Sequence, residues 1–165
     1  MIDQGATAPE FSLPGIKVSA EDGTPSTYRL SDALEDGPVF LNFYVFDFHP
    51  KCTENLCDLH DVEWFGLEES VTVFGVSTDG SFSHRAFAAE QGLDYALLSD
   101  GDGSVAEAYD VLYEEFKGHK RVAKRAVFLI DTDRTVRYAW STDDPSRQPN
   151  WTEIEAALSP LIPSH

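Results

Sequence analysis

The stretch VFLNFYVFDFHPKCTENLCDLHD, residues 39–61, joins a continuous apolar run to both cysteines of the chain, Cys52 and Cys57. Residues 39–46 are β-branched or aromatic apart from one leucine and one asparagine, which is typical of a strand buried on both faces of a sheet. Behind a proline, leucines and a tryptophan then recur near helical spacing, so residues 52–67 predict a helix. The cysteines therefore open a helix that follows a buried strand.

Strand and helix patterns alternate along the rest of the chain. The predicted elements are a loop at 5–30, a short helix at 31–37 with Ser31 as N-cap, strands at 71–77 and 95–99, helices at 81–91 and 103–112, a β-hairpin of 125–131 and 135–141, and a closing amphipathic helix at 150–162. This order predicts one α/β domain spanning residues 1–165, with a central mixed β-sheet flanked by helices in the thioredoxin-like layout. In such sheets reacting groups lie beyond the carboxyl ends of the strands, where the cysteine stretch falls.

Composition excludes several classes of partner. The chain carries 29 acidic and 12 basic residues, a formal charge of −17, which would repel nucleic acid and anionic membranes. No apolar run approaches the roughly 20 residues that span a bilayer, and the first residues lack a secretory signal, so we expect a cytoplasmic protein. The acidity also suggests a salt-adapted, halophile-like surface. Residues 117–125 are the cationic exception, and a solvated loop is one interpretation of them that leaves out Arg125.

The spacing of the cysteines bears on their chemistry. A thiolate is the reactive form, and the first turn of a helix favours a negative charge at Cys52, whereas Cys57 lies more than a turn further along. An i to i+5 pair in a helix is about 7.5 Å apart along the axis, and a disulfide tolerates Cα separations only up to roughly 6.8 Å. Bridging the pair would therefore require the helix start to unwind. Two alternatives remain: buried cysteines without chemistry, and a metal site, for which C-x4-C lacks a second ligand pair.

Four stretches make the chain resemble the peroxiredoxins of the alkyl hydroperoxide reductase and thiol-specific antioxidant superfamily, and most closely the bacterioferritin comigratory protein branch. They are GATAPEFSLPG, VFLNFYVFDFHPKCTENLCDLHD, VFGVSTDGSFSHRAFAAEQGLDYALLSD and RAVFLIDTDRTVRYAW. The resemblance runs from about residue 5 to residue 158, and the C-x4-C spacing is typical of members that carry both cysteines in one helix.

This resemblance implies that Cys52 is the peroxidatic cysteine, Cys57 the resolving cysteine and Arg125 the arginine beside the thiolate. It implies a thiol peroxidase that takes hydroperoxides and is reduced by a thioredoxin-like dithiol protein, with no metal or other cofactor. Two positions depart from the family pattern: Val45 stands for the usual proline, and His49 for the usual threonine or serine. We expect His49 to replace the missing hydroxyl as a hydrogen-bond donor.

Two other functions use the same fold and the same cysteines. A thiol–disulfide oxidoreductase would act on protein disulfides, although its usual spacing is C-x-x-C. A redox sensor or binding module would use the unwinding helix as a signal to a partner. A monomer and a homodimer are both compatible with the sequence.

Overall fold

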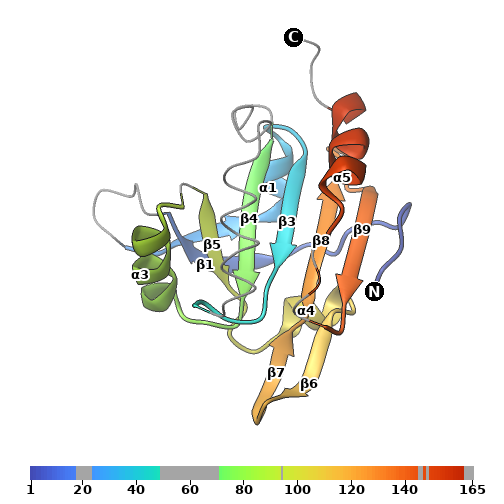
Figure 1. Ribbon diagram of the computed structural model, residues 1–165. Helices are drawn as coiled ribbons and strands as arrows, with labels where there is room; N and C mark the ends of the chain where they lie inside the picture. Colours follow the sequence, from blue (N-terminus) through green and yellow to red (C-terminus); the bar gives the residue numbers. More distant parts are fainter. Residues whose placement is uncertain (18–23, 49–70, 94, 145–146, 148, 162–165) are drawn as a thin grey trace.

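The structure, a computed structural model, describes residues 1–17, 24–48, 71–93, 95–144, 147 and 149–161 (Figure 1). Its elements are β1 (Ser12–Ile16), β2 (Ser26–Arg29), α1 (Leu30–Leu34), β3 (Val39–Phe43), β4 (Thr72–Ser77), α3 (Ser81–Gln91), β5 (Ala96–Ser99), α4 (Ser104–Ala108), β6 (Leu112–Phe116), β7 (His119–Ala123), β8 (Arg125–Ile130), β9 (Val136–Thr142), α5 (Trp151–Leu158) and the 3₁₀ turn η2 (Ser159–Leu161). Within these ranges, no helix has both the length and the apolar character needed to cross a membrane.

The central sheet has seven strands in the order β2-β1-β5-β4-β3-β8-β9. β3, β4 and β5 are parallel, and β8 and β9 are antiparallel to their neighbours. The predicted mixed sheet is therefore confirmed, as is the predicted hairpin of β8 and β9. Because β8 runs against β3, the carboxyl end of β3 and the start of β8 lie at the same end of the sheet (Figure 1).

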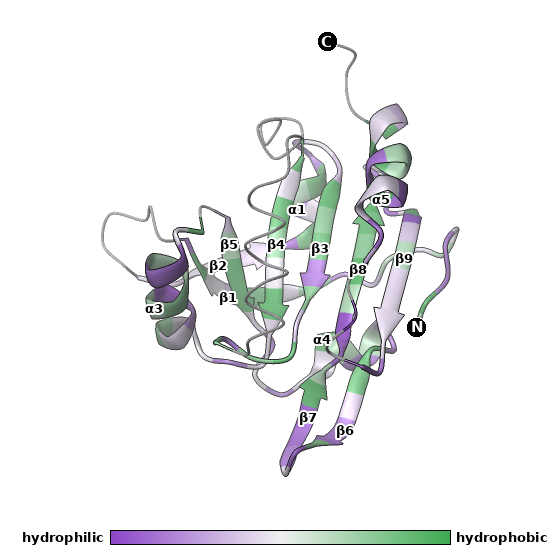
Figure 2. Ribbon diagram, viewed as in Figure 1, coloured by the Kyte–Doolittle hydropathy of each residue, from purple (hydrophilic) through white to green (hydrophobic). Residues whose placement is uncertain are grey.

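Helices cover both faces of this sheet. Alternate residues of β3 and β8 point into two separate apolar clusters, one that includes residues of α1 and α4 and one that includes residues of α3 and α5. Figure 2 shows the consequence in colour, since the central strands are hydrophobic along most of their length and the edge strand β9 is much less so. Burial on both faces explains why the apolar run at the start of the cysteine stretch forms a strand.

The predicted loop at 5–30 is wrong, because β1 and β2 lie within it. Pro14 and Gly15 favour a loop by sequence alone. Pro14 is tolerated because residues 12–14 pair with β2 alone, so its missing N–H leaves no ladder bond unmade on the other side. Gly15 fits a strand here because a Cβ would overlap the side chain of Leu98 on β5 and lie 3.0 Å from the backbone oxygen of Leu97. Both residues therefore fit a strand for reasons that only the pairing reveals.

The cationic segment 117–125 is also not a solvated loop, since most of it belongs to the hairpin of β6 and β7 and to the start of β8. Lys117 and Gly118 both have positive φ, 48° and 86°, which is the backbone of a tight two-residue hairpin turn. The hairpin extends from the end of the sheet where β8 begins (Figure 1). Its strands are half exposed and highly charged, so they lack the alternation that would predict them.

The ends of several predicted elements shift. α1 begins at Leu30 with Arg29 as a cap that makes no side-chain bond, and the N–H of Ser31 donates to Glu10 Oε1 at 3.0 Å, so Ser31 is not the N-cap. The helix predicted at 103–112 ends at Ala108, and the strand predicted to reach residue 46 ends at Phe43. The helix predicted at 150–162 begins at Trp151, and Asn150 is its N-cap, since the Asn150 side chain accepts two backbone N–H bonds.

Candidate functional site

Of the four predicted site residues, the structure places only Arg125. His49, Cys52 and Cys57 lie outside the described residues, as does the helix predicted at 52–67. Phe48 is the last described residue before them, four positions ahead of Cys52 in the sequence. The geometry of the site is therefore built from the residues that surround the end of β3.

Arg125 is the first residue of β8 and is 1% exposed. The last pair of the β3–β8 ladder joins Phe43 to Ala126, so Tyr44 and Arg125 follow it at the same end of the sheet. One guanidinium nitrogen of Arg125 donates to the backbone carbonyl of Arg147, and the group lies 5.9 Å from the ring centre of Trp140 on β9. A permanent positive charge is thus held by Arg147 and Trp140 at the end of the sheet where β3 ends.

A second feature at this end is a buried hydrogen-bonded network around Asp47. Its carboxylate accepts a bond from the Tyr44 hydroxyl at 2.6 Å and one from the Ser83 hydroxyl at 2.8 Å, and lies 2.9 Å from Nδ1 of His84. The other ring nitrogen of His84 lies 2.9 Å from the carbonyl oxygen of Leu98. The rings of Tyr44 and His84 are both fully buried. Burial and the neighbouring Asp47 carboxylate hold the pKa of Tyr44 well above its usual range, so the hydroxyl stays protonated and donates.

Asp79 ties the same segment to the end of β4. Its Oδ2 accepts the backbone N–H of Asp47 at 2.7 Å and the hydroxyl of Ser77 at 2.7 Å. Burial raises the pKa of Asp79 despite these bonds, which favour the ionised form. Burial therefore disfavours the ionised form of Asp79, and folding favours the protonated form.

This shift gives a testable dependence of stability on pH. An acid whose pKa is raised in the folded state contributes stability at low pH, and that contribution is lost as the pH rises through the folded-state pKa. We expect the free energy of unfolding of the native protein to increase relative to that of Asp79→Asn as the pH is lowered from 7 toward the ordinary range of an aspartate. Urea unfolding of both proteins across that range measures the difference; a native protein that lost stability relative to Asp79→Asn toward acid would contradict the shift.

Asp47, Asp79 and His84 have ligand atoms within 4.8 Å of one another, so among the described residues they form a group that could hold a metal ion. The distances between these side chains fit hydrogen bonds better than coordination of a metal ion. His84 Nδ1 and the Asp47 carboxylate are at hydrogen-bond distance, and the oxygens of Asp47 and Asp79 already accept bonds from hydroxyl or N–H groups. We therefore interpret the group as a hydrogen-bonded network.

None of the residues of this network was predicted from the sequence. Its signals were present but weak: Asp47 interrupts an aromatic stretch, and the pair Ser83–His84 falls near the start of α3, whose buried face is otherwise apolar. A polar side chain on a buried face indicates a partner without showing which one.

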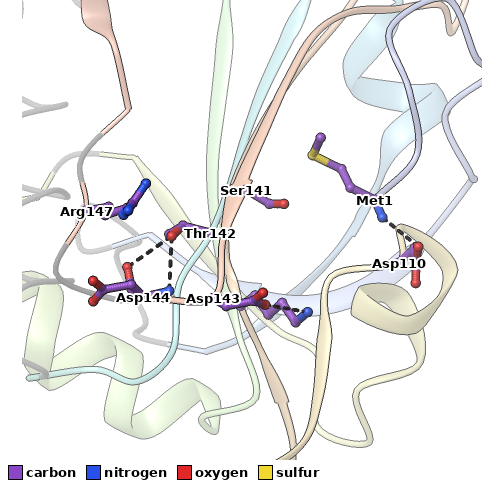
Figure 3. A pocket seen from close by; sticks show the side chains of 8 residues that line it. Met1, Asp110, Ser141, Thr142, Asp143, Asp144 and Arg147 are labelled. Carbon is purple, nitrogen blue, oxygen red and sulfur yellow. Dashed lines mark hydrogen bonds and ion pairs between the residues drawn. The ribbon is translucent and has the colours of Figure 1, made fainter.

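A polar pocket of about 450 Å³ lies beside Arg147, whose carbonyl receives the Arg125 bond (Figure 3). It is lined by Met1, Asp110, Lys124, Ser141, Thr142, Asp143, Asp144 and Arg147. The terminal amine of Met1 lies 2.6 Å from Asp110, and Lys124 lies 2.7 Å from Asp143, so these charges pair with one another across the lining. The pocket adjoins the anchor of Arg125 and does not contain its guanidinium.

Comparisons with known proteins agree with this geometry. Residues 4–139 match the AhpC/TSA family. The peroxiredoxin Bcp of Bacillus subtilis is 32% identical over 141 residues, which are 84% of this chain and 85% of the relative. The crystal structure of peroxidoxin BcpB from Mycobacterium tuberculosis is 33% identical with a TM-score of 0.78, over 98% of this chain and 97% of that one. The thioredoxin peroxidase I of Plasmodium yoelii is 28% identical with a TM-score of 0.72, over 96% and 90%.

Proposed function

Because the chain belongs to the AhpC/TSA family of peroxiredoxins, we propose that it is a thiol-dependent peroxidase in which Cys52 is the attacking sulfur, Cys57 the resolving sulfur and Arg125 the cation beside them. The observation that carries this assignment is the position of Arg125. A buried, oriented guanidinium lies at the same end of the sheet as the segment that runs to Cys52. A fixed cation there stabilises both a thiolate and the polar oxygens of a peroxide.

The reaction balances without a cofactor. The Cys52 thiolate attacks one peroxide oxygen, an S–O bond forms and the O–O bond breaks, and the departing oxygen takes a proton and leaves as water or an alcohol. The sulfur is oxidised to a sulfenic acid and the peroxide is reduced. The Cys57 thiol then attacks this sulfur, an S–S bond forms and water is released.

We propose that a thioredoxin-like dithiol protein reduces the resulting disulfide by thiol–disulfide exchange. The name of the Plasmodium yoelii relative, thioredoxin peroxidase I, supports this class of reductant. His49 keeps its predicted role as a donor near Cys52, in the place where the family has a hydroxyl.

The decisive experiment replaces the resolving cysteine. In Cys57→Ser, one equivalent of hydrogen peroxide is expected to leave a sulfenic acid on Cys52, because the partner that would condense with it is absent. Mass spectrometry after trapping with dimedone measures the adduct and locates it. The native protein, treated in the same way, is expected to show a Cys52–Cys57 disulfide and little adduct; an adduct absent from both proteins would contradict the proposed function.

A further inference from the structure

We propose that the Asp47–His84 pair, with Tyr44, is a positioning unit that fixes the segment between β3 and Cys52 for reaction with peroxide. This inference rests on the proposed function, since it concerns the reactivity of the same cysteine. None of the three residues carries a role in the reaction described above. Their contacts, their protonation and the backbone beside them each support the proposal.

Asp47 is held by three different elements. Its backbone N–H is bonded to Asp79 beyond β4, its carboxylate is bonded to Ser83 and His84 of α3, and Tyr44 at the end of β3 donates to the same carboxylate. Through His84 the network also reaches the Leu98 carbonyl of β5. The residue five positions before Cys52 is thereby tied to the ends of the three parallel strands and to a helix. Few degrees of freedom remain to it.

The contact between Asp47 and His84 requires a proton. A carbonyl oxygen only accepts, so Nε2 of His84 carries a hydrogen that it donates to Leu98. A neutral ring would then turn the lone pair of Nδ1 toward a carboxylate 2.9 Å away, which is repulsive. One proton therefore lies between Asp47 and His84, and the pair is neutral as a whole. Because buried pairs of this kind add little stability over apolar packing, we infer that this pair serves to define the geometry around Asp47.

Phe48 supplies an independent observation. Its φ is 67°, in the left-handed region that costs a residue with a side chain on the order of 1 kcal/mol. Such a conformation persists where the surroundings hold it. The ring of Phe48 packs edge-on against Phe87 of α3, 5.0 Å between centres, and the preceding residue is the anchored Asp47. The network and this contact together fix the backbone at Asp47 and Phe48, the last described residues before Cys52 in the sequence.

Two replacements of His84 distinguish the contribution of the Nδ1 bond to Asp47 from that of the Nε2 bond to Leu98. In His84→Asn the amide nitrogen takes the place of Nδ1 and keeps a donor for Asp47, whereas in His84→Gln the amide reaches the place of Nε2 and keeps only the bond to Leu98. We expect His84→Asn to react with hydrogen peroxide within about 3-fold of the native rate constant and His84→Gln to react roughly 10- to 100-fold more slowly, because orientation of the attacking group is lost. Stopped-flow tryptophan fluorescence measures the rate constants.

Alkylation of Cys52 by iodoacetamide is the control readout, because a general loss of structure would change its rate as well. Alkylation needs a thiolate but no oriented peroxide, so its rate in His84→Gln is expected to stay within about 3-fold of the native rate. A decrease in the peroxide rate alone supports positioning. Equal decreases in both rates, or His84→Asn and His84→Gln behaving alike, would overturn it.

Tyr44→Phe tests the unit with His84 itself unchanged and has a matched control. It removes the hydroxyl that donates to Asp47 and lies 3.2 Å from Nδ1 of His84, and it keeps the ring, which stacks on Phe87. Tyr109→Phe makes the same change at a fully buried ring whose hydroxyl donates to the carbonyl of Pro9, in the other apolar cluster. We expect the peroxide rate constant to fall about 3- to 10-fold in Tyr44→Phe and to stay within about 2-fold in Tyr109→Phe.

The possible failures are distinguishable. If the native protein reacts rapidly with peroxide and Tyr44→Phe matches Tyr109→Phe, the positioning role is overturned and the peroxidase assignment stands. If Cys57→Ser forms no sulfenic acid at Cys52 and the native protein forms no Cys52–Cys57 disulfide after peroxide, both are overturned.

Discussion

Cys52→Ser is expected to lose peroxide reduction, with a rate lower by more than about 10³-fold. A serine hydroxyl is essentially un-ionised near neutral pH and is a far weaker nucleophile than a thiolate, so the first bond to oxygen does not form. Consumption of hydrogen peroxide, with dithiothreitol as the reductant, measures the loss. A normal thermal unfolding curve establishes that the variant is folded.

Cys57→Ser is the matched control, because it makes the same change at the other cysteine. In the absence of dithiothreitol it is expected to consume one equivalent of peroxide at close to the native rate and to end as a sulfenic acid on Cys52, since only the second step is removed. The reverse pattern, with Cys57 needed for the first equivalent, would exchange the two roles. Rapid reduction of a protein disulfide such as insulin together with slow reaction with peroxide would instead favour the thiol–disulfide oxidoreductase.

The central part of the fold was predictable because its sequence pattern is local. The apolar run from Val39 and the helix of α3 with Gly92 behind it each show their own periodicity and end signals, and the structure confirms them. Gly92 has the left-handed backbone of a helix C-cap, φ 68°. The order of strands and helices then leaves few topologies, which is why a mixed sheet could be expected.

The parts that sequence did not predict depend on pairing between distant residues. β6 and β7 pair as a hairpin with Lys117 and Gly118 in its turn. Their charged strands show no alternation of polar and apolar residues. His84 and Asp47 are 37 positions apart, and nothing local to either residue identifies the other. Arg125 was predicted by resemblance to a family, whereas its bond to Arg147 and its contact with Trp140 follow only from the folded chain.

Arg125→Lys is expected to lower the rate constant for peroxide reduction by about 10²- to 10³-fold, the magnitude typical of removing one preorganised donor from a reacting centre. Lysine keeps the positive charge but lacks the planar guanidinium with its five N–H groups. It therefore cannot keep the bond to the Arg147 carbonyl and the contact with Trp140 while also donating to the thiolate or the peroxide. The rate constant is measured by stopped-flow fluorescence. Arg121→Lys is the matched control, since Arg121 lies in the same cationic segment but is paired with Glu107 at the surface.

Arg125→Met separates the charge of the side chain from its shape. Without a cation beside it the Cys52 thiolate is less stable, so the pH profile of alkylation by iodoacetamide is expected to move to higher pH in Arg125→Met and to move less in Arg125→Lys. Arg125 is almost fully buried, so thermal unfolding of each variant is measured beside its rates. If both variants unfolded more easily but kept the native rate constant and pH profile, Arg125 would act only as a tether between β8, Trp140 and Arg147, and a different group would have to stabilise the thiolate.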